Sequence, residues 1–412
     1  MAGEVHFALQ KYVAMAGCGN ILKEPGMSLL SSTRHMSSNT VKTSLVLVLY
    51  TGGTIGMKKL NENEPCALHL DIFINELKRL PMLHDDSACY VSQGEKEIST
   101  SQRLAMPVSK LGIRIMYDIK ESGKIRESKD TCAEDWIDVS VEIFDNYEKY
   151  DGFVILHGTD TMAFTASALS FMFENLGKPV VLTGAQTPIY DELTDARDNL
   201  CGALLFAGQC VVPEVMIFFD GKLFRGNRST KVDAKSYSVF DSPSFPPLAK
   251  LSSNGEIEWH CCVEKCQEGQ SFRLHTKMSQ KIALLPMFPS IPVEMIKGCL
   301  EPPIEGVVMV TYGSGNIPDS RTDLITAIRE AVQRGVVIVT CCPCRGGPHD
   351  VSMQLVEQGL IDIGIVPGGD ITAEAALTKL SFVLGKEGLT LDERRKVSCV
   401  LLMGQAILTH TM

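Results

Sequence analysis

The sequence has no apolar run close to the ~18 residues that a membrane-spanning helix needs, so we expect no membrane partner. It has no cluster of Lys and Arg either, and its net charge is −10. Binding to nucleic-acid phosphates needs a basic surface. Nucleic acid is therefore also excluded as an expected partner.

Signatures of common catalytic and cofactor sites are absent as well. The chain contains no G-x-S-x-G, no H-E-x-x-H and no G-x-x-x-x-G-K-[ST]. Its 14 cysteines include clusters at 261–266 and 341–344, but neither offers the two C-x2-C units of a zinc module. We expect no metal and no cofactor. The cysteines are typical of reduced thiols, which predicts a cytoplasmic protein.

The length of 412 residues, with 45% hydrophobic and 21% charged residues, is typical of a globular protein of two domains. Residues 1–43 are rich in Ser, Met and Gly and lack a period, so we expect a disordered extension. They lack the continuous apolar segment of a secretory signal. A mitochondrial presequence is the weaker alternative, because Glu4 and Glu24 are acidic.

Strand-like and helix-like segments alternate from residue 44 onward, which predicts an α/β fold with a mostly parallel sheet. The segment 84–128 fits no period and receives no assignment. We expect a first domain over 44–245, with strands at Leu45–Tyr50, Gly152–Leu156, Pro179–Thr183 and Val215–Phe219 and helices at Met162–Leu176 and Asp195–Ala207.

The proline-containing, polar segment 246–280 interrupts this alternation and is interpreted as an interdomain connection. A second α/β domain follows over 281–412. Its expected strands are Ile282–Pro286, Gly306–Thr311 and Val336–Thr340, and its expected helices are Asp323–Arg334 and Ala373–Leu384.

Two segments follow predicted strands directly, at the edge where open α/β sheets bind ligands. The first, Thr51–Gly56, has adjacent glycines and so fails the dinucleotide spacing G-x-G-x-x-G. Adjacent glycines instead allow the backbone to approach a small ligand closely. The hydroxyl of Thr54 is then available on a loop at the end of the strand.

The second segment, His157–Met162, places Thr159, Asp160 and Thr161 before a helix, whose N-terminus favours anionic groups. Helix capping by Asp160 or Thr161 is the alternative. His157 could act as a base, but a histidine that closes a buried strand is more often structural.

A third segment, 225–233, contains Lys231. A lysine that meets a carboxylate and a hydroxyl can help to activate a weak nucleophile such as threonine. Lys231 would do so only if it meets Thr159 and Asp160. Otherwise the segment is a solvated basic loop.

The ordered set of motifs resembles the L-asparaginase family of the bacterial and cytosolic mammalian type. The resemblance covers about residues 45–390. The matching motifs are Tyr50–Met57, Asp151–Ala163, Leu182–Gln186, Phe224–Arg228, Ser229–Lys231, Tyr312–Asn316 and Glu374–Leu380.

The resemblance implies two α/β domains, the larger at the N-terminus, that assemble as a homodimer or homotetramer. It implies hydrolysis of L-asparagine to L-aspartate and ammonia. Thr54 resembles the nucleophile that forms a covalent aspartyl ester. Thr159, Asp160 and Lys231 resemble the second catalytic group, which activates a hydroxyl or water.

The resemblance also implies how substrate is held. Ser128 matches the residue that binds the α-carboxylate, with Lys129 beside it, and Asp160 would also hold the α-ammonium. The backbone of Gly53 and Gly158 would bind the substrate and the developing oxyanion. Asn316 would reach the site of a neighbouring subunit.

Three features depart from the family pattern. The tyrosine that the family places beside the nucleophile is missing from both 57–80 and 343–360. Lys129 stands in place of a serine, and the tail after Asp392 does not resemble the family ending. Two alternatives therefore stay open: a lysophospholipase or other ester hydrolase on the same scaffold, and a binding protein with a lapsed site.

Overall fold

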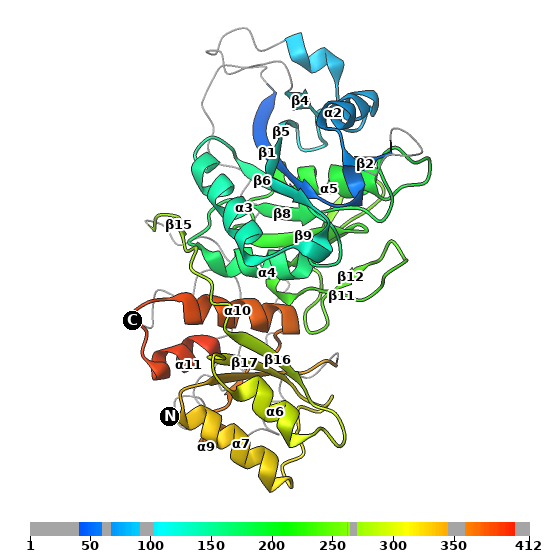
Figure 1. Ribbon diagram of the computed structural model, residues 1–412. Coiled ribbons are helices and arrows are strands. Elements are labelled where there is room, and N and C mark those ends of the chain that lie inside the picture. The colour runs from blue at the N-terminus through cyan, green and yellow to red at the C-terminus, as the bar shows by residue number, and fades with distance from the viewer. Residues whose placement is uncertain are drawn as a thin grey trace.

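The computed structural model describes residues 41–59, 67–90, 103–261, 263, 270–344 and 359–399. These residues form two sheets, each flanked by helices, one above the other in Figure 1. The expected extension over 1–43 lies outside the described residues except at its end, where Lys42 begins the first strand. None of the described helices is long and apolar enough to cross a membrane.

The larger sheet has nine strands in the order β14-β13-β10-β9-β8-β6-β1-β5-β4. The five adjacent strands from β9 to β5 are parallel, and the strands at both edges are antiparallel. The strands are β1 (Lys42–Gly52), β4 (Leu104–Ala105), β5 (Ile113–Arg126), β6 (Gly152–Leu156), β8 (Val180–Thr183), β9 (Val215–Phe219), β10 (Lys222–Arg225), β13 (Ala249–Leu251) and β14 (Ile257–Trp259).

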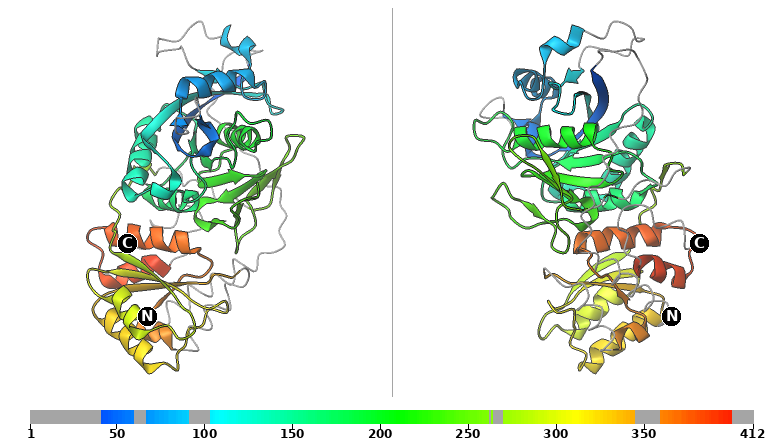
Figure 2. Two further views of the ribbon diagram at one scale, coloured as in Figure 1. Left: turned by 45° about the vertical axis from the view of Figure 1, so that its right-hand side comes forward. Right: turned by 180° about the vertical axis from the view of Figure 1, so that it is seen from behind.

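Helices cover both faces of this sheet, which is why its central strands are apolar without alternation. Val46 and Val48 of β1 belong to one core with α5 (Ala196–Gln209) and α2 (Leu70–Arg79). Leu47 and Leu49 point to the opposite core, with α3 (Ala133–Asn146) and α4 (Met162–Met172). Figure 2 shows these two helical layers from other directions.

The smaller sheet has the order β16-β17-β18-β19 and is parallel throughout. Helices α6 and α7 share a core with one face, and α10 and α11 share a core with the other. Helix α10 lies between the two sheets and packs on α4 of the first domain (Figure 1). The bounds are β16 (Ile282–Pro286), α6 (Val293–Leu300), β17 (Gly306–Val310), α7 (Thr322–Gln333), β18 (Val337–Cys341), α9 (Leu360–Ile363), β19 (Val366–Pro367), α10 (Ala373–Gly385) and α11 (Leu391–Cys399).

The predicted α/β class, with a large N-terminal sheet and a separate small C-terminal sheet, is confirmed. The unassigned segment 84–128 contains β5, which pairs in parallel with β1. Ile113, Ile115 and Tyr117 are buried in its first half, an alternation of period two that the sequence does contain. Segment 246–280 is more than a connection, because β13 and β14 lie in it and extend the large sheet.

Short strand pairs complete the fold. The helix expected over Met162–Leu176 ends at Met172, because Phe173 and Glu174 form β7 (Phe173–Glu174) against β15 (Arg273–Leu274). The hairpin of β11 (Thr230–Lys231) and β12 (Phe240–Asp241) lies close to the junction of the two domains (Figure 1). Near the end of β1, β2 (Met57–Lys58) pairs with β3 (Ala67–Leu68).

Candidate active site

Three loops meet at the carboxyl edge of the large sheet, because β1, β5 and β6 are adjacent and parallel. The ends of β1 and β5 are in register at Gly52 and Arg126. The segment that contains Ser128 follows β5, and the segment that begins with His157 follows β6. Side chains far apart in the sequence therefore share one edge, as expected for ligand sites in open α/β sheets.

Glycine backbones make the closest contacts between these loops. Gly53 has φ +88°, and a Cβ on it would lie 2.5 Å from the backbone nitrogen of Gly158. A Cβ on Gly158 would in turn lie 2.6 Å from Oγ of Ser128. Only glycine fits at these two positions, so Gly53, Gly158 and Ser128 stack directly on one another.

Thr54 begins a single 3-10 turn, Thr54–Gly56, directly after Gly53. Its side chain is exposed, whereas Ile55 and Gly56 behind it are buried. The backbone nitrogen of Ile189 donates to the carbonyl of Ile55 at 2.9 Å, which ties the turn to the loop before α5. The hydroxyl of Thr54 is thus presented to solvent from an anchored turn.

Two tyrosines support this turn, although neither lies where the sequence analysis looked for one. The phenol of the buried Tyr50 donates to the carbonyl of Gly53 at 2.7 Å. The phenol of Tyr190 donates to the carbonyl of Gly56 at 3.4 Å, and Nζ of Lys58 lies 4.5 Å from its ring centroid. The sequence gives no signal for Tyr190, because it is more than a hundred residues from the turn.

Lys231 does meet the polar pair that follows β6. Its Nζ donates to Oγ1 of Thr159 at 2.8 Å and to Oδ1 of Asp160 at 2.7 Å. The Lys231 side chain is 19% exposed and that of Asp160 is 64% exposed. An amine, a carboxylate and a hydroxyl therefore form one chain of hydrogen bonds, with the carboxylate open to solvent.

Ser128 lies against the start of the same segment. Its buried Oγ accepts a hydrogen bond from the backbone nitrogen of Asp160 at 3.3 Å. The Thr161 hydroxyl donates to the carbonyl of Ser128 at 2.7 Å and makes no capping bond to α4. The helix-capping interpretation is therefore wrong for Thr161, and the Asp160 carboxylate accepts from Lys231 instead.

His157 is a buried structural residue, as the sequence analysis favoured, and it belongs to a hydrogen-bond chain. The indole of Trp136 donates to Oγ1 of Thr165, which lies 3.0 Å from Nε2 of His157. Nδ1 of His157 lies 2.7 Å from the carbonyl of Gly158, which can only accept. Burial lowers the pKa of His157 and favours the neutral ring, in which Nδ1 donates to Gly158 and Nε2 accepts from the Thr165 hydroxyl. His157 therefore orients the peptide of Gly158.

Two residues that were predicted to bind substrate, Lys129 and Asn316, make no side-chain hydrogen bond to the other predicted site residues that the structure describes. Nζ of the exposed Lys129 pairs with the carboxylate of Glu127, which raises the pKa of Lys129. Asn316 lies in the loop after β17, where its carbonyl accepts from the backbone of Tyr312. Among the described residues, no hydrogen bond joins Asn316 to the loops of the first domain.

A small cavity lies behind the stacked backbones. It measures about 20 Å³ and is lined by Ser122, Arg126, Asp135, Trp136 and Gly158, among others. This volume suits one water molecule. Within the described residues, no group of three or more His, Cys, Asp and Glu side chains could hold a metal ion.

The arrangement offers parts for acyl transfer. Thr54 supplies an exposed hydroxyl, the pair of Lys231 and Thr159 can move a proton, and Asp160 presents a carboxylate to a cationic group. The backbones of Gly53 and Gly158 lie against each other at the same edge.

Two family models match most of the chain. The model described as asparaginase, N-terminal, matches residues 45–263, and the model of the glutaminase/asparaginase C-terminal domain matches residues 281–397.

Curated relatives agree with these models. An L-asparaginase of Dirofilaria immitis is 41% identical over 87% of this chain and 60% of its own length. A 60 kDa lysophospholipase of Mus musculus is 42% identical over 89% of this chain and 63% of its own length. L-asparaginase 1 of Escherichia coli K12 is 34% identical over 86% of this chain and 95% of its own length. The chain thus spans about three fifths of the first two relatives.

Among solved structures, L-asparaginase I of Vibrio cholerae matches with a TM-score of 0.72 at 35% identity, covering 89% of this chain and all of that one. The L-asparaginase of Thermococcus kodakarensis gives a TM-score of 0.70 at 27% identity, covering 88% of this chain and 99% of that one. From its matched domains, its relatives and its fold, the chain belongs to the asparaginase family.

Proposed function

We propose that this protein hydrolyses L-asparagine to L-aspartate and ammonia, without a cofactor or metal. The observation that carries the proposal is the contact of Lys231 with Thr159 and Asp160, which follow β6 at the sheet edge where the exposed Thr54 follows β1. A threonine hydroxyl is a weak nucleophile and needs a base, and in this proposal the cluster of Lys231, Thr159 and Asp160 accepts its proton.

In this scheme Oγ1 of Thr54 attacks the side-chain amide carbon and its proton passes into the hydrogen-bonded cluster. The carbon–nitrogen bond then breaks, and the amide nitrogen leaves as ammonia after taking up a proton. Water hydrolyses the resulting aspartyl ester and restores the Thr54 hydroxyl. Lys231 and Thr159 relay the protons in both halves of the reaction.

Substrate recognition follows from charge. The carboxylate of Asp160 is the partner for the α-ammonium, and Oγ of Ser128 with nearby backbone amides is the partner for the α-carboxylate. The stacked backbones of Gly53 and Gly158 flank the developing oxyanion. Lys129 would have to leave Glu127 to contribute, and Asn316 would act on a neighbouring copy in a homodimer or homotetramer.

The test is ammonia release from the purified protein, titrated with L-asparagine from micromolar to tens of millimolar concentrations. Thr54→Ala and Lys231→Met are the blanks, each checked for folding by circular dichroism. We expect saturable release that is lost in both variants. A folded Thr54→Ala protein with ordinary activity would contradict the mechanism. No release from folded wild type would favour a lapsed binding protein, and light scattering in the same buffer gives the oligomeric state.

A second candidate function is hydrolysis of a lysophospholipid ester, since the similar protein of Mus musculus is named a 60 kDa lysophospholipase. The cavity behind Ser128 and Gly158 has room for about one water, so an acyl chain would have to lie elsewhere. Fatty-acid release from lysophosphatidylcholine, with the same Thr54→Ala blank, distinguishes the two. Release that exceeds ammonia production would overturn the preference for asparagine.

A further inference from the structure

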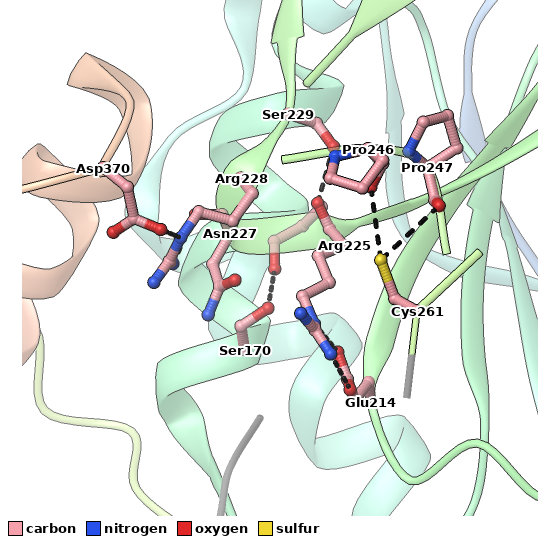
Figure 3. Close-up of polar contacts among 11 residues, drawn as sticks. Ser170, Glu214, Arg225, Asn227, Arg228, Ser229, Pro246, Pro247, Cys261 and Asp370 are labelled. Carbon is pink, nitrogen blue, oxygen red and sulfur yellow. Dashed lines mark hydrogen bonds and ion pairs between the residues drawn. The ribbon is translucent and has the colours of Figure 1, made fainter. Parts of the chain in front are cut away.

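The chain reaches Lys231 through a segment that the second domain contacts at two points. The first point is Arg228, the last residue of the 3-10 turn Gly226–Arg228. Its Nε donates to Oδ2 of Asp370 at 2.7 Å (Figure 3). The two side chains are 3% and 0% exposed. A paired and buried charge of this kind leaves the backbone at Arg228 little freedom.

The second point is Thr230, the residue before Lys231. Its hydroxyl donates to Oε1 of Glu374 at 2.5 Å. Glu374 lies in the first turn of α10, which Thr372 caps by accepting from the backbone nitrogen of Ala375 at 3.2 Å. Because α10 is packed between α4 and the small sheet, Glu374 is a firmly supported partner.

Ser229, between these two points, is held from within the first domain. Its hydroxyl donates to the carbonyl of Arg225 at 2.6 Å (Figure 3). Arg225 is itself buried in an ion pair with Glu214, with Nε 2.8 Å from Oε2. Each of the three residues before Lys231 therefore makes a hydrogen bond through its side chain.

Because these contacts fix the backbone of the strand, they also determine where the Lys231 side chain points. Successive side chains of a β-strand point to opposite faces. Thr230 points to α10, so Lys231 points the other way, to Thr159 and Asp160. Holding the hydroxyl of Thr230 thus also holds the rotation of the backbone that carries Nζ of Lys231.

We propose that Glu374, through Thr230, and Asp370, through Arg228, are positioning residues for Lys231. The second domain thereby controls a proton-transfer group of the first domain without touching the substrate. The expected effect on turnover rests on the proposed function of Lys231. The expected effect on the position and reactivity of the Lys231 amine does not depend on that function. Because the lysine side chain is flexible, a loosened backbone at Thr230 lets Nζ leave Thr159 and Asp160.

The experiment compares Thr230→Val, which removes the hydroxyl but keeps the shape, with Thr230→Ser, which restores a hydroxyl. Thr378→Val is the matched control. The hydroxyl of Thr378 lies one turn further along α10 and bonds only to carbonyls of its own helix, those of Glu374 and Ala375. All variants are first compared with wild type by thermal melting.

Two readouts separate positioning from simple destabilisation. The first is steady-state ammonia release, resolved into kcat and KM. The second is the rate at which Lys231 is acetylated by trace acetic anhydride, measured by mass spectrometry relative to the exposed Lys250. The second readout needs no enzymatic activity.

For Thr230→Val we expect kcat to fall about tenfold, as for loss of one hydrogen bond to a charged group, with KM within about twofold. We expect acetylation of Lys231 to rise severalfold. Thr230→Ser should restore both values, and Thr378→Val should change neither. If acetylation responds in this way while no variant and no wild type releases ammonia, the positioning inference stands and the proposed function fails.

Folded Thr230→Val with wild-type kcat and wild-type acetylation of Lys231 would overturn the inference. A lower kcat with unchanged acetylation would overturn it as well, because the loss would not pass through Lys231. Asp370→Asn tests the other contact with the same readouts. Since that change breaks a buried ion pair and can prevent folding, the Thr230 variants decide the question.

Discussion

The most quantitative prediction concerns Lys379, a lysine buried in α10 at the junction of the domains. Its side chain is only 4% exposed, and Nζ donates to the carbonyl of Ser398 in α11 at 2.9 Å. Burial lowers the pKa of Lys379 from 10.5 to about 7. The nearby charges oppose one another, since Asp370 and Cys399 raise the pKa and Arg228 lowers it.

The sign of the pH dependence follows from proton counting. Below pH 7 Lys379 is protonated in both states, and the folded state carries the full cost of the buried charge. Between the folded pKa of about 7 and the unfolded value of 10.5, the unfolded chain holds more protons, so stability rises with pH. At about 1.4 kcal/mol for each pKa unit, the whole cost is about 5 kcal/mol. From pH 6.5 to 8.5 the relief is about 2 kcal/mol.

The perturbation is Lys379→Met, which keeps the length of the side chain and removes the titration. Urea unfolding of wild type and variant is followed by circular dichroism at pH 6.5, 7.5 and 8.5. Groups such as His157 are common to both proteins, so their titration cancels in the comparison, whereas the bond from Nζ to Ser398 is part of the Lys379 contribution that is measured. We expect the free energy of unfolding of wild type, minus that of the variant, to increase by about 2 kcal/mol over this range. A difference that is constant or falls with pH would refute the reasoning, because Lys379 would then remain charged in the folded protein.

Three further predictions concern other parts of the chain. Gly53→Ala should lower both activity and melting temperature, because its Cβ would collide with Gly158. Gly112 is the control, because it has a similar φ of +73° and a Cβ there would meet nothing within 4 Å. Gly112→Ala should therefore cost only the backbone strain of about 1–2 kcal/mol. Glu214→Gln removes the carboxylate of a pair that is 8% and 6% exposed and should destabilise the fold by about 3 kcal/mol, while Glu305→Gln at the surface should cost less than about 1 kcal/mol in the same urea titration. Dialysis against a chelator should leave ammonia release unchanged, and a loss that zinc restores would contradict the metal-free mechanism.

Short apolar strands were the part of the fold that the sequence predicted best. Gly152–Leu156, Val215–Phe219 and Ile282–Pro286 have the expected ends, because glycine, proline and polar residues bound short apolar runs. Strand β5 was missed although its first half alternates, because only Ile113, Ile115 and Tyr117 follow the period before exposed polar residues replace it. Strands β13 and β14 have three residues each, too few for a periodic signal.

The sequence also predicted some features of the candidate site and missed others. Motifs at strand ends predicted which loops would meet, and Lys231 reaches Thr159 and Asp160. The supporting contacts of Trp136, Thr165 and Glu374 could not be predicted, because each joins helices or loops whose relative position depends on the packed cores. Periodicity within one segment carries no information about such contacts. The assigned catalytic roles stay predictions until the variants are measured.

The position of α10 has a consequence for the way the molecule loses its structure. This helix packs on α4 in one direction and on the small sheet in the other, and Phe382 lies against Phe171 with ring centroids 6.3 Å apart. Separating the domains would expose apolar surface on both, so each domain alone would present to water a surface that is buried in the whole protein. The two domains should therefore melt in a single transition, and fragments cut near residue 270 should aggregate when apart and regain order when mixed.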